Sequence, residues 1–95
     1  MSEYLQNLKE AVSALHGCDC SHTATNRVIE FFEDRKVFDG NVDSFHLLGH
    51  PAATTAFAWA FDNGKEPQYV AVLRVPPIAS PSDAVRAAIA SGAFR

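Results

Sequence analysis

The chain has 95 residues, which is enough for a single domain over residues 1–95, and 47% of them are hydrophobic, which excludes a disordered polymer. Its net charge is −3 and its lysines and arginines are scattered, so we expect no nucleic-acid partner and no membrane-surface partner. There is no signal-peptide pattern at the start and no apolar run of the roughly 20 residues that span a bilayer, so we expect a cytoplasmic protein.

The first segment predicts an amphipathic helix that ends at Gly17. Ser2 is suited to the N-cap, and Glu3 in the first turn interacts favourably with the helix dipole. Apolar residues recur at spacings of three and four and form one stripe: Tyr4, Leu5, Leu8, Ala11, Val12 and Leu15. Gly17 is a natural stop, because helices commonly end on a glycine in the left-handed conformation.

The segment 25–36 is compatible with two structures. Residues 27–32 are β-branched and aromatic, which favours a strand followed by a turn at 33–35. A helix over 25–36 is the alternative, because three apolar side chains would then share a face: Val28, Ile29 and Phe32. We favour the strand. Residues 39–41 then predict a bulge or a turn, and residues 42–48 predict a further strand.

The second half of the chain has a clearer pattern. Residues 54–61 alternate strictly, with aromatic side chains on one face (Phe57, Trp59 and Phe61) and alanines on the other. Residues 62–67 contain an Asn-Gly pair and predict a hairpin loop, and residues 68–75 supply the partner strand. We expect the aromatic face, and Trp59 in particular, to lie in the core rather than to form a base-stacking platform, because no lysine or arginine flanks it.

A second helix is predicted near the end of the chain. Ser80 takes the N-cap, Pro81 the first helical position and Asp83 the third, which is close to a capping box. A thin apolar stripe follows, and Gly92 ends the helix.

The predicted order is therefore α-β-β-β-β-α, an α+β fold in which the N- and C-terminal helices cover one face of an antiparallel four-stranded sheet. If residues 25–36 were helical, the sheet would have three strands. Both faces of the predicted sheet are apolar, so helices on one face would leave the other uncovered. Because an uncovered apolar face larger than roughly a few hundred Å² usually marks an interface, we expect a homodimer.

Several short motifs resemble those of a group of short bacterial proteins of unknown function. The motifs are Gly49-His50-Pro51-Ala52, Ala58-Trp59, the segment 72–77, Ser80-Pro81 and Ala84-Val85-Arg86. The likeness covers roughly the last half of the chain. It implies a bacterial source and a shared fold, and it carries no activity over.

Both cysteines and two of the four histidines fall within seven residues: His16, Cys18, Cys20 and His22. Zinc prefers four nitrogen or sulfur ligands, so this cluster predicts a zinc-type site as an alternative function. The spacing of one residue is too tight for one peptide to supply all four ligands without strain. A site of two or three ligands completed by His46, His50 or a symmetry mate is more plausible, and a plain loop with the cysteines beneath a helix is the other possibility.

Our main functional expectation is a small binding or interaction protein rather than an enzyme, because no nucleophile–histidine–carboxylate grouping stands out. His46 and His50 fit a polar sheet face and a turn. Strands followed by an alanine-rich helix also match the order of the double-stranded-RNA-binding domain, and this is a third reading. That family places lysines at the start of its last helix, where this chain has Pro81, Ser82 and Asp83.

Overall fold

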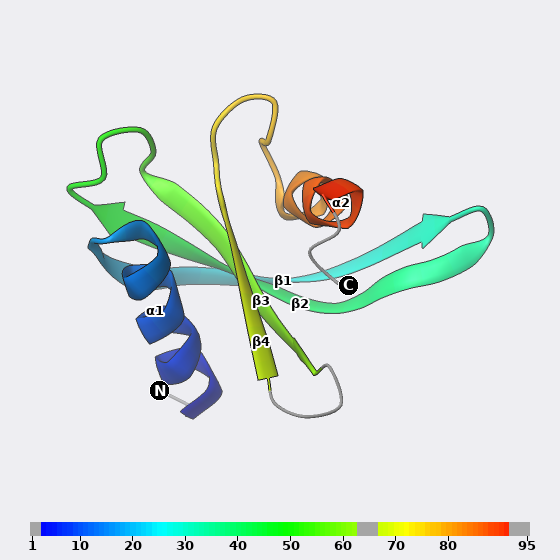
Figure 1. The fold of residues 1–95 in the computed structure, drawn as a ribbon, viewed down its shortest axis with the longest axis horizontal. Coiled ribbons are helices and arrows are strands. Elements are labelled where there is room, and N and C mark those ends of the chain that lie inside the picture. The colour runs from blue at the N-terminus through cyan, green and yellow to red at the C-terminus, as the bar shows by residue number, and fades with distance from the viewer. Residues whose placement is uncertain (1–2, 63–66, 92–95) are drawn as a thin grey trace.

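The structure, a computed structural model, describes residues 3–62 and 67–91. Its elements are α1 (Glu3–His16), β1 (Asp19–Phe32), β2 (Arg35–Leu48), β3 (Thr55–Asp62), β4 (Pro67–Leu73) and α2 (Pro81–Ser91). The strands form one antiparallel sheet in the order β1-β2-β3-β4 (Figure 1). The predicted α-β-β-β-β-α order and the α+β class are therefore confirmed.

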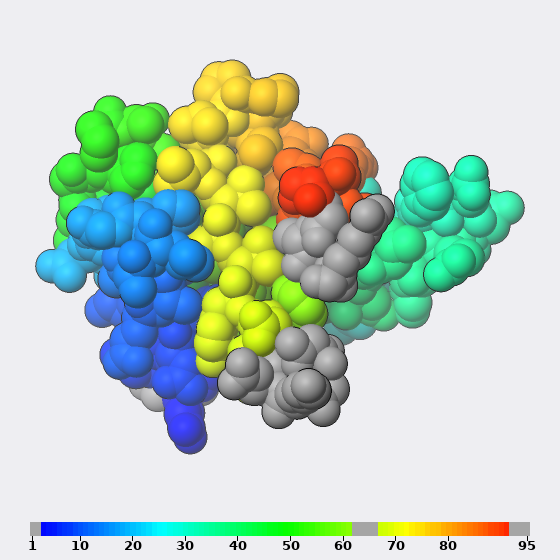
Figure 2. Space-filling model, in the orientation of Figure 1, coloured from blue at the N-terminus to red at the C-terminus, as the bar shows by residue number. Residues whose placement is uncertain are grey.

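β1 and β2 pair along their whole lengths, but β2 pairs with β3 only over Asp43–His46. The rest of the β1–β2 hairpin, residues 27–41, continues beyond this pairing, and we call it the arm; its base still packs against the body through Val28 and Phe38. Figure 1 shows the arm extending beyond β3 and β4, and in Figure 2 its end stands clear of the remaining surface. The sheet is thus four strands wide at one end and two at the other.

The arm settles the ambiguity over residues 25–36 in favour of a strand. Its turn is Glu33-Asp34, with φ of 50° and 64°, and two left-handed residues are the signature of a tight hairpin turn. The prediction of a turn or bulge at Asp39–Asn41 is wrong, because these residues continue β2. Pairing with β1 overrides their turn-like composition. The β1–β2 ladder is irregular at two other places. One lies between His22 and Ala24, and the other lies between Glu30 and Phe31, where Val37 is the extra residue on β2.

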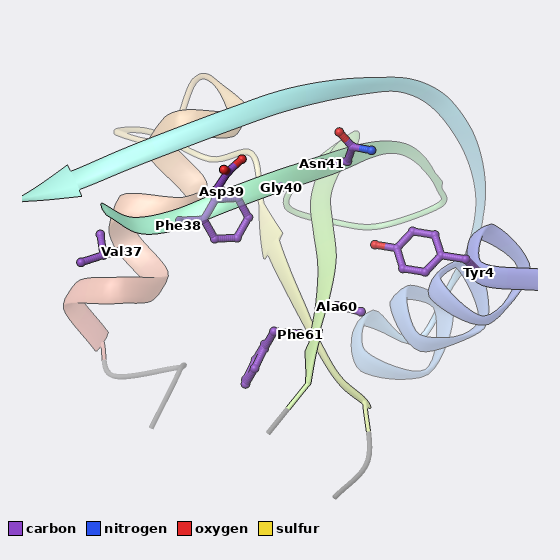
Figure 3. Close-up of a pocket in the computed structure, with 8 residues that line it drawn as sticks. All are labelled: Tyr4, Val37, Phe38, Asp39, Gly40, Asn41, Ala60 and Phe61. Carbon is purple, nitrogen blue, oxygen red and sulfur yellow. The ribbon is translucent and has the colours of Figure 1, made fainter. Parts of the chain in front are cut away.

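The two helices cover opposite faces of the sheet, so the prediction that both lie on one face is wrong. The core divides into two clusters. Leu8 and Val12 of α1 pack with Ala56 and Ala58, while α2 packs against the aromatic face. That second cluster contains Val28, Val42, Phe57, Trp59, Ala84, Val85 and Ala88. Figure 3 views the sheet nearly edge-on, with the helices on either side of it and Ala60 and Phe61 pointing in opposite directions.

The helix ends behave as the sequence predicts. Gly17 has a φ of 67°, and its N–H donates to the Ser13 carbonyl at 2.8 Å. At the start of α2 the Asp83 N–H donates to Ser80 Oγ at 3.2 Å, and the Asp83 carboxylate accepts the Ala79 N–H at 3.1 Å. The predicted Asn-Gly turn at 63–64 and the stop at Gly92 lie outside the described residues.

Trp59 is 1% exposed, and its ring meets Phe38 edge-on with centroids 5.7 Å apart. Because truncation would remove the largest side chain of the α2 cluster, we expect Trp59→Ala to lower the free energy of unfolding by about 3–5 kcal/mol. Chemical denaturation followed by circular dichroism measures this. Phe32→Ala, at a position that is 63% exposed, is the control and should change stability little. An unchanged midpoint for Trp59→Ala would contradict a buried aromatic face.

Candidate functional site

The cluster of cysteines and histidines in the sequence is dispersed in the fold. Cys20 is buried beneath α1, with its Sγ 3.5 Å from both the Lys9 carbonyl oxygen and Ser13 Oγ. Cys18 packs at the edge of the hydrophobic core cluster beneath α1. His22 on β1 instead contacts the carboxylate of Asp43 on β2. Within residues 3–62 and 67–91, no three histidine, cysteine or acidic side chains are close enough to hold a metal ion. The zinc prediction therefore gains no support from the arrangement.

His16 lies beside His50 instead, with ring centroids 6.0 Å apart and the rings nearly perpendicular. His50 Nδ1 accepts the N–H groups of Ala52 at 3.0 Å and Ala53 at 3.2 Å. Since both bonds need an Nδ1 lone pair, the proton of a neutral His50 is on Nε2. His16 Nε2 is buried without a hydrogen-bond partner among the described residues. Burial, assisted by His50, lowers the pKa of His16.

The lowered pKa of His16 predicts a loss of stability in acid. Below the ordinary imidazole pKa of about 6.5, the unfolded chain takes up a proton at this position more readily than the folded chain does. The free energy of unfolding should therefore fall as the pH is lowered through this range, and His16→Gln should reduce that dependence. Urea titrations at several pH values test this, with His46→Gln on exposed β2 surface as the control. Identical pH profiles for His16→Gln and the unmodified chain would contradict it.

A buried polar cluster lies where β2 leaves β3. Asp43 is 1% exposed, and its Oδ1 is 2.9 Å from His22 Nε2. Thr25 donates its hydroxyl to the same oxygen, and His22 Nε2 is 3.1 Å from Thr25 Oγ1. The strand register brings these groups together, because Thr25 is opposite Asp43 and Asp43 is opposite Ala58. A carboxylate removed from water requires such partners.

The contacts of His22 and Thr25 supply hydrogen-bond partners to the buried Asp43 carboxylate, and they do not form a catalytic relay. In a relay the histidine lies between the nucleophile and the acid, and it takes the proton of the nucleophile. Here the Thr25 proton goes directly to Asp43, and His22 approaches the same carboxylate oxygen. Sequence reasoning missed the set, because His22 and Asp43 are 21 residues apart and only the pairing of β1 with β2 joins them.

Removal of His22 should leave the buried Asp43 carboxylate with one side-chain partner fewer. We expect His22→Ala to lower the free energy of unfolding by about 1–3 kcal/mol, and His22→Ala with Asp43→Ala to lower it by less than the sum of the single changes. Thermal and urea unfolding of the single and double variants gives the coupling. His46→Ala is the control. Additive effects would mean that the two side chains do not interact.

A groove lies between the end of the arm and α2. We call it the arm groove, and it is lined by Glu30, Phe31, Phe32, Val37, Arg86, Ile89 and Ala90, with a volume of about 320 Å³. Phe31 and Phe32 are 64% and 63% exposed, which is unusual for adjacent aromatic residues. Arg86 Nε donates to Glu30 Oε1 at 2.5 Å and joins α2 to the arm. The groove is therefore apolar and includes one ion pair.

A second hollow separates β2 from β3, and we call it the strand gap. Its volume is about 470 Å³, and its lining is Tyr4, Val37, Phe38, Asp39, Gly40, Asn41, Ala60 and Phe61 (Figure 3). Tyr4 reaches into it from α1 and forms a hydrogen bond with the Ala60 backbone. This bond favours the phenolate, so the donor must be the Ala60 N–H. Burial outweighs it and raises the pKa of Tyr4.

No family model matches this chain, and searches of curated proteins and of solved structures found no match. The resemblance to short bacterial proteins therefore stays a prediction, and functional reasoning depends on geometry. No helix among the described residues is long and apolar enough to cross a membrane.

Proposed function

We propose that this chain is a small binding protein that associates as a homodimer through the arm groove. The observation that carries the proposal is the exposure of Phe31 and Phe32 at the end of a hairpin that projects from the body. Two aromatic side chains with nearly two thirds of their surface exposed leave on the order of 100 Å² of apolar area each in water. Covering that area favours association.

The reason for a dimer differs from the one that the sequence suggested. The expected uncovered sheet face does not exist, because α1 and α2 pack on opposite faces. Three exposed large hydrophobic side chains lie on the arm instead, and two of them, Phe31 and Phe32, are more exposed than any other large hydrophobic side chain among the described residues. A projecting pair of phenylalanines and an apolar groove on the same chain suit a two-fold interface, in which each copy offers both parts to the other.

The charges at the arm turn also favour a second copy as the partner. Glu33 and Asp34 are followed directly by Arg35 and Lys36. Two such turns related by a two-fold axis can set the acidic half of one against the basic half of the other, which favours self-association over binding to a uniformly charged partner. Nucleic acid is a poor partner by the same reasoning, since Lys36 and Arg27 already pair with Asp39.

Sedimentation velocity at micromolar concentration should give about twice the chain mass for the unmodified protein, because a dimer would cover the exposed phenylalanines of both arms. Phe31→Ser with Phe32→Ser should give a folded monomer. The control is Leu15→Ser with Leu48→Ser, which removes side chains that are 59% and 51% exposed elsewhere, and it should remain dimeric. A monomeric unmodified chain at high concentration, or equal effects of both double variants, would reject the proposal.

A further inference from the structure

The ladder between β2 and β3 stops at Asp43 opposite Ala58, although β2 continues to Arg35 and β3 to Asp62. We propose that the strand gap binds an extended peptide of a partner protein as an added strand, paired with β2 through the backbone of Asp39 and Asn41. The strand gap shares Val37 with the arm groove, but the backbone contacts proposed for Asp39 and Asn41 do not depend on the homodimer.

The direction of the backbone groups supports the site. The Leu47 N–H donates to the Thr54 carbonyl on the β3 side of β2 at 2.8 Å. Because backbone groups alternate sides along a strand, those of Asp43, Asn41 and Asp39 point the same way. Asp43 pairs with β3, whereas Asn41 and Asp39 face the strand gap, where no backbone hydrogen bond forms within residues 3–62 and 67–91.

The two sides of the gap are not equivalent. The next pair of the ladder would join Asn41 to Ala60, but the Tyr4 hydroxyl accepts the Ala60 N–H instead. Tyr4 thus supplies a partner to one of the two Ala60 backbone groups that face β2. On the β2 side of the gap, the N–H and C=O groups of both Asn41 and Asp39 remain for an incoming strand.

The gap has room for a short strand. Five consecutive residues of β2, Val37–Asn41, line the hollow of about 470 Å³, so this edge is open to solvent. Three residues of extended chain, at about 3.4 Å each, with a strand spacing of about 4.8 Å and a depth of about 10 Å, occupy about 500 Å³. The hollow therefore matches a segment of about three residues, which suits the addition of a strand to an exposed edge.

The walls of the gap indicate which peptide fits. The side towards α2 presents Phe38 and Phe61, and the side towards α1 presents Tyr4 and Asn41 (Figure 3). Successive side chains of an added strand point to opposite sides, so apolar and polar residues should alternate in the peptide.

The charge around the gap favours an uncharged residue at the polar position. The adjoining hollow is lined by Glu3, Tyr4, Asn7, Ala60, Phe61, Pro67 and Tyr69, so Glu3 contributes one negative charge. Asp39 pairs with two cations, Arg27 and Lys36, which leaves an excess of one positive charge beside the gap. These charges offset each other, so a peptide that alternates apolar and uncharged polar residues complements both walls.

The test is a titration of the ¹⁵N-labelled full chain with an acetylated, amidated peptide of alternating valine and threonine, five residues long. We expect saturable shifts of the Asp39 and Asn41 amide signals. The same peptide methylated on the backbone nitrogens that face β2 should bind at least about tenfold more weakly, since each lost backbone bond costs about 1 kcal/mol or more.

A variant of the chain gives an independent check. Asn41→Pro removes the N–H that points into the gap and should abolish the response, while Phe31→Ser with Phe32→Ser should bind the peptide as the unmodified chain does. That double variant separates this site from the dimer. The proposal is overturned if the methylated peptide binds equally well, if no shifts occur at Asp39 and Asn41, or if the shifts are confined to Ile89 and Ala90 in the arm groove.

Discussion

The burial of the Asp43 carboxylate is the constraint on which the rest of this structure depends. Asp43 lies on the last pair of the β2–β3 ladder, and it is held from the β1 side by His22 and Thr25. This contact keeps β1 joined to β2 at the position where β2 leaves β3. A charged group at the centre of a sheet fixes the strand register, because a shift of one residue would place the carboxylate on the opposite face among aromatic side chains. The arm and the strand gap both start from this position.

The elements that depend on local sequence were predictable. The caps of α2, the glycine end of α1 and the alternating strand around Trp59 each follow from neighbouring residues, and the structure has all of them. The prediction of a turn or bulge at Asp39–Asn41 was wrong because it used local composition alone. That segment is a strand only because it pairs with β1. Alternation between small and aromatic residues correctly predicted two different sheet faces. It did not reveal that the alanine face admits α1 while the aromatic face packs against α2, because that depends on the path of the chain between elements.

The candidate sites were less predictable, because they are built from contacts between distant residues. Proximity in the sequence suggested a metal site at His16, Cys18, Cys20 and His22, but β1 directs Cys20 under α1 and His22 towards Asp43. His50 was among the residues expected to complete that site, and it does lie beside His16, but its Nδ1 accepts the N–H groups of Ala52 and Ala53. Phe31 and Phe32 were read as ordinary strand residues. Their exposure follows from the early end of the β2–β3 ladder, which no local pattern indicates.

The turn of the arm has a consequence for how this sequence is constrained. Glu33 and Asp34 both adopt left-handed backbone conformations. Aspartate tolerates this conformation as asparagine and glycine do, whereas it costs glutamate about 1 kcal/mol. An asparagine–glycine pair would therefore suit the turn better. The chain thus keeps four consecutive charges, residues 33–36, at the end of the arm at the expense of backbone preference at Glu33.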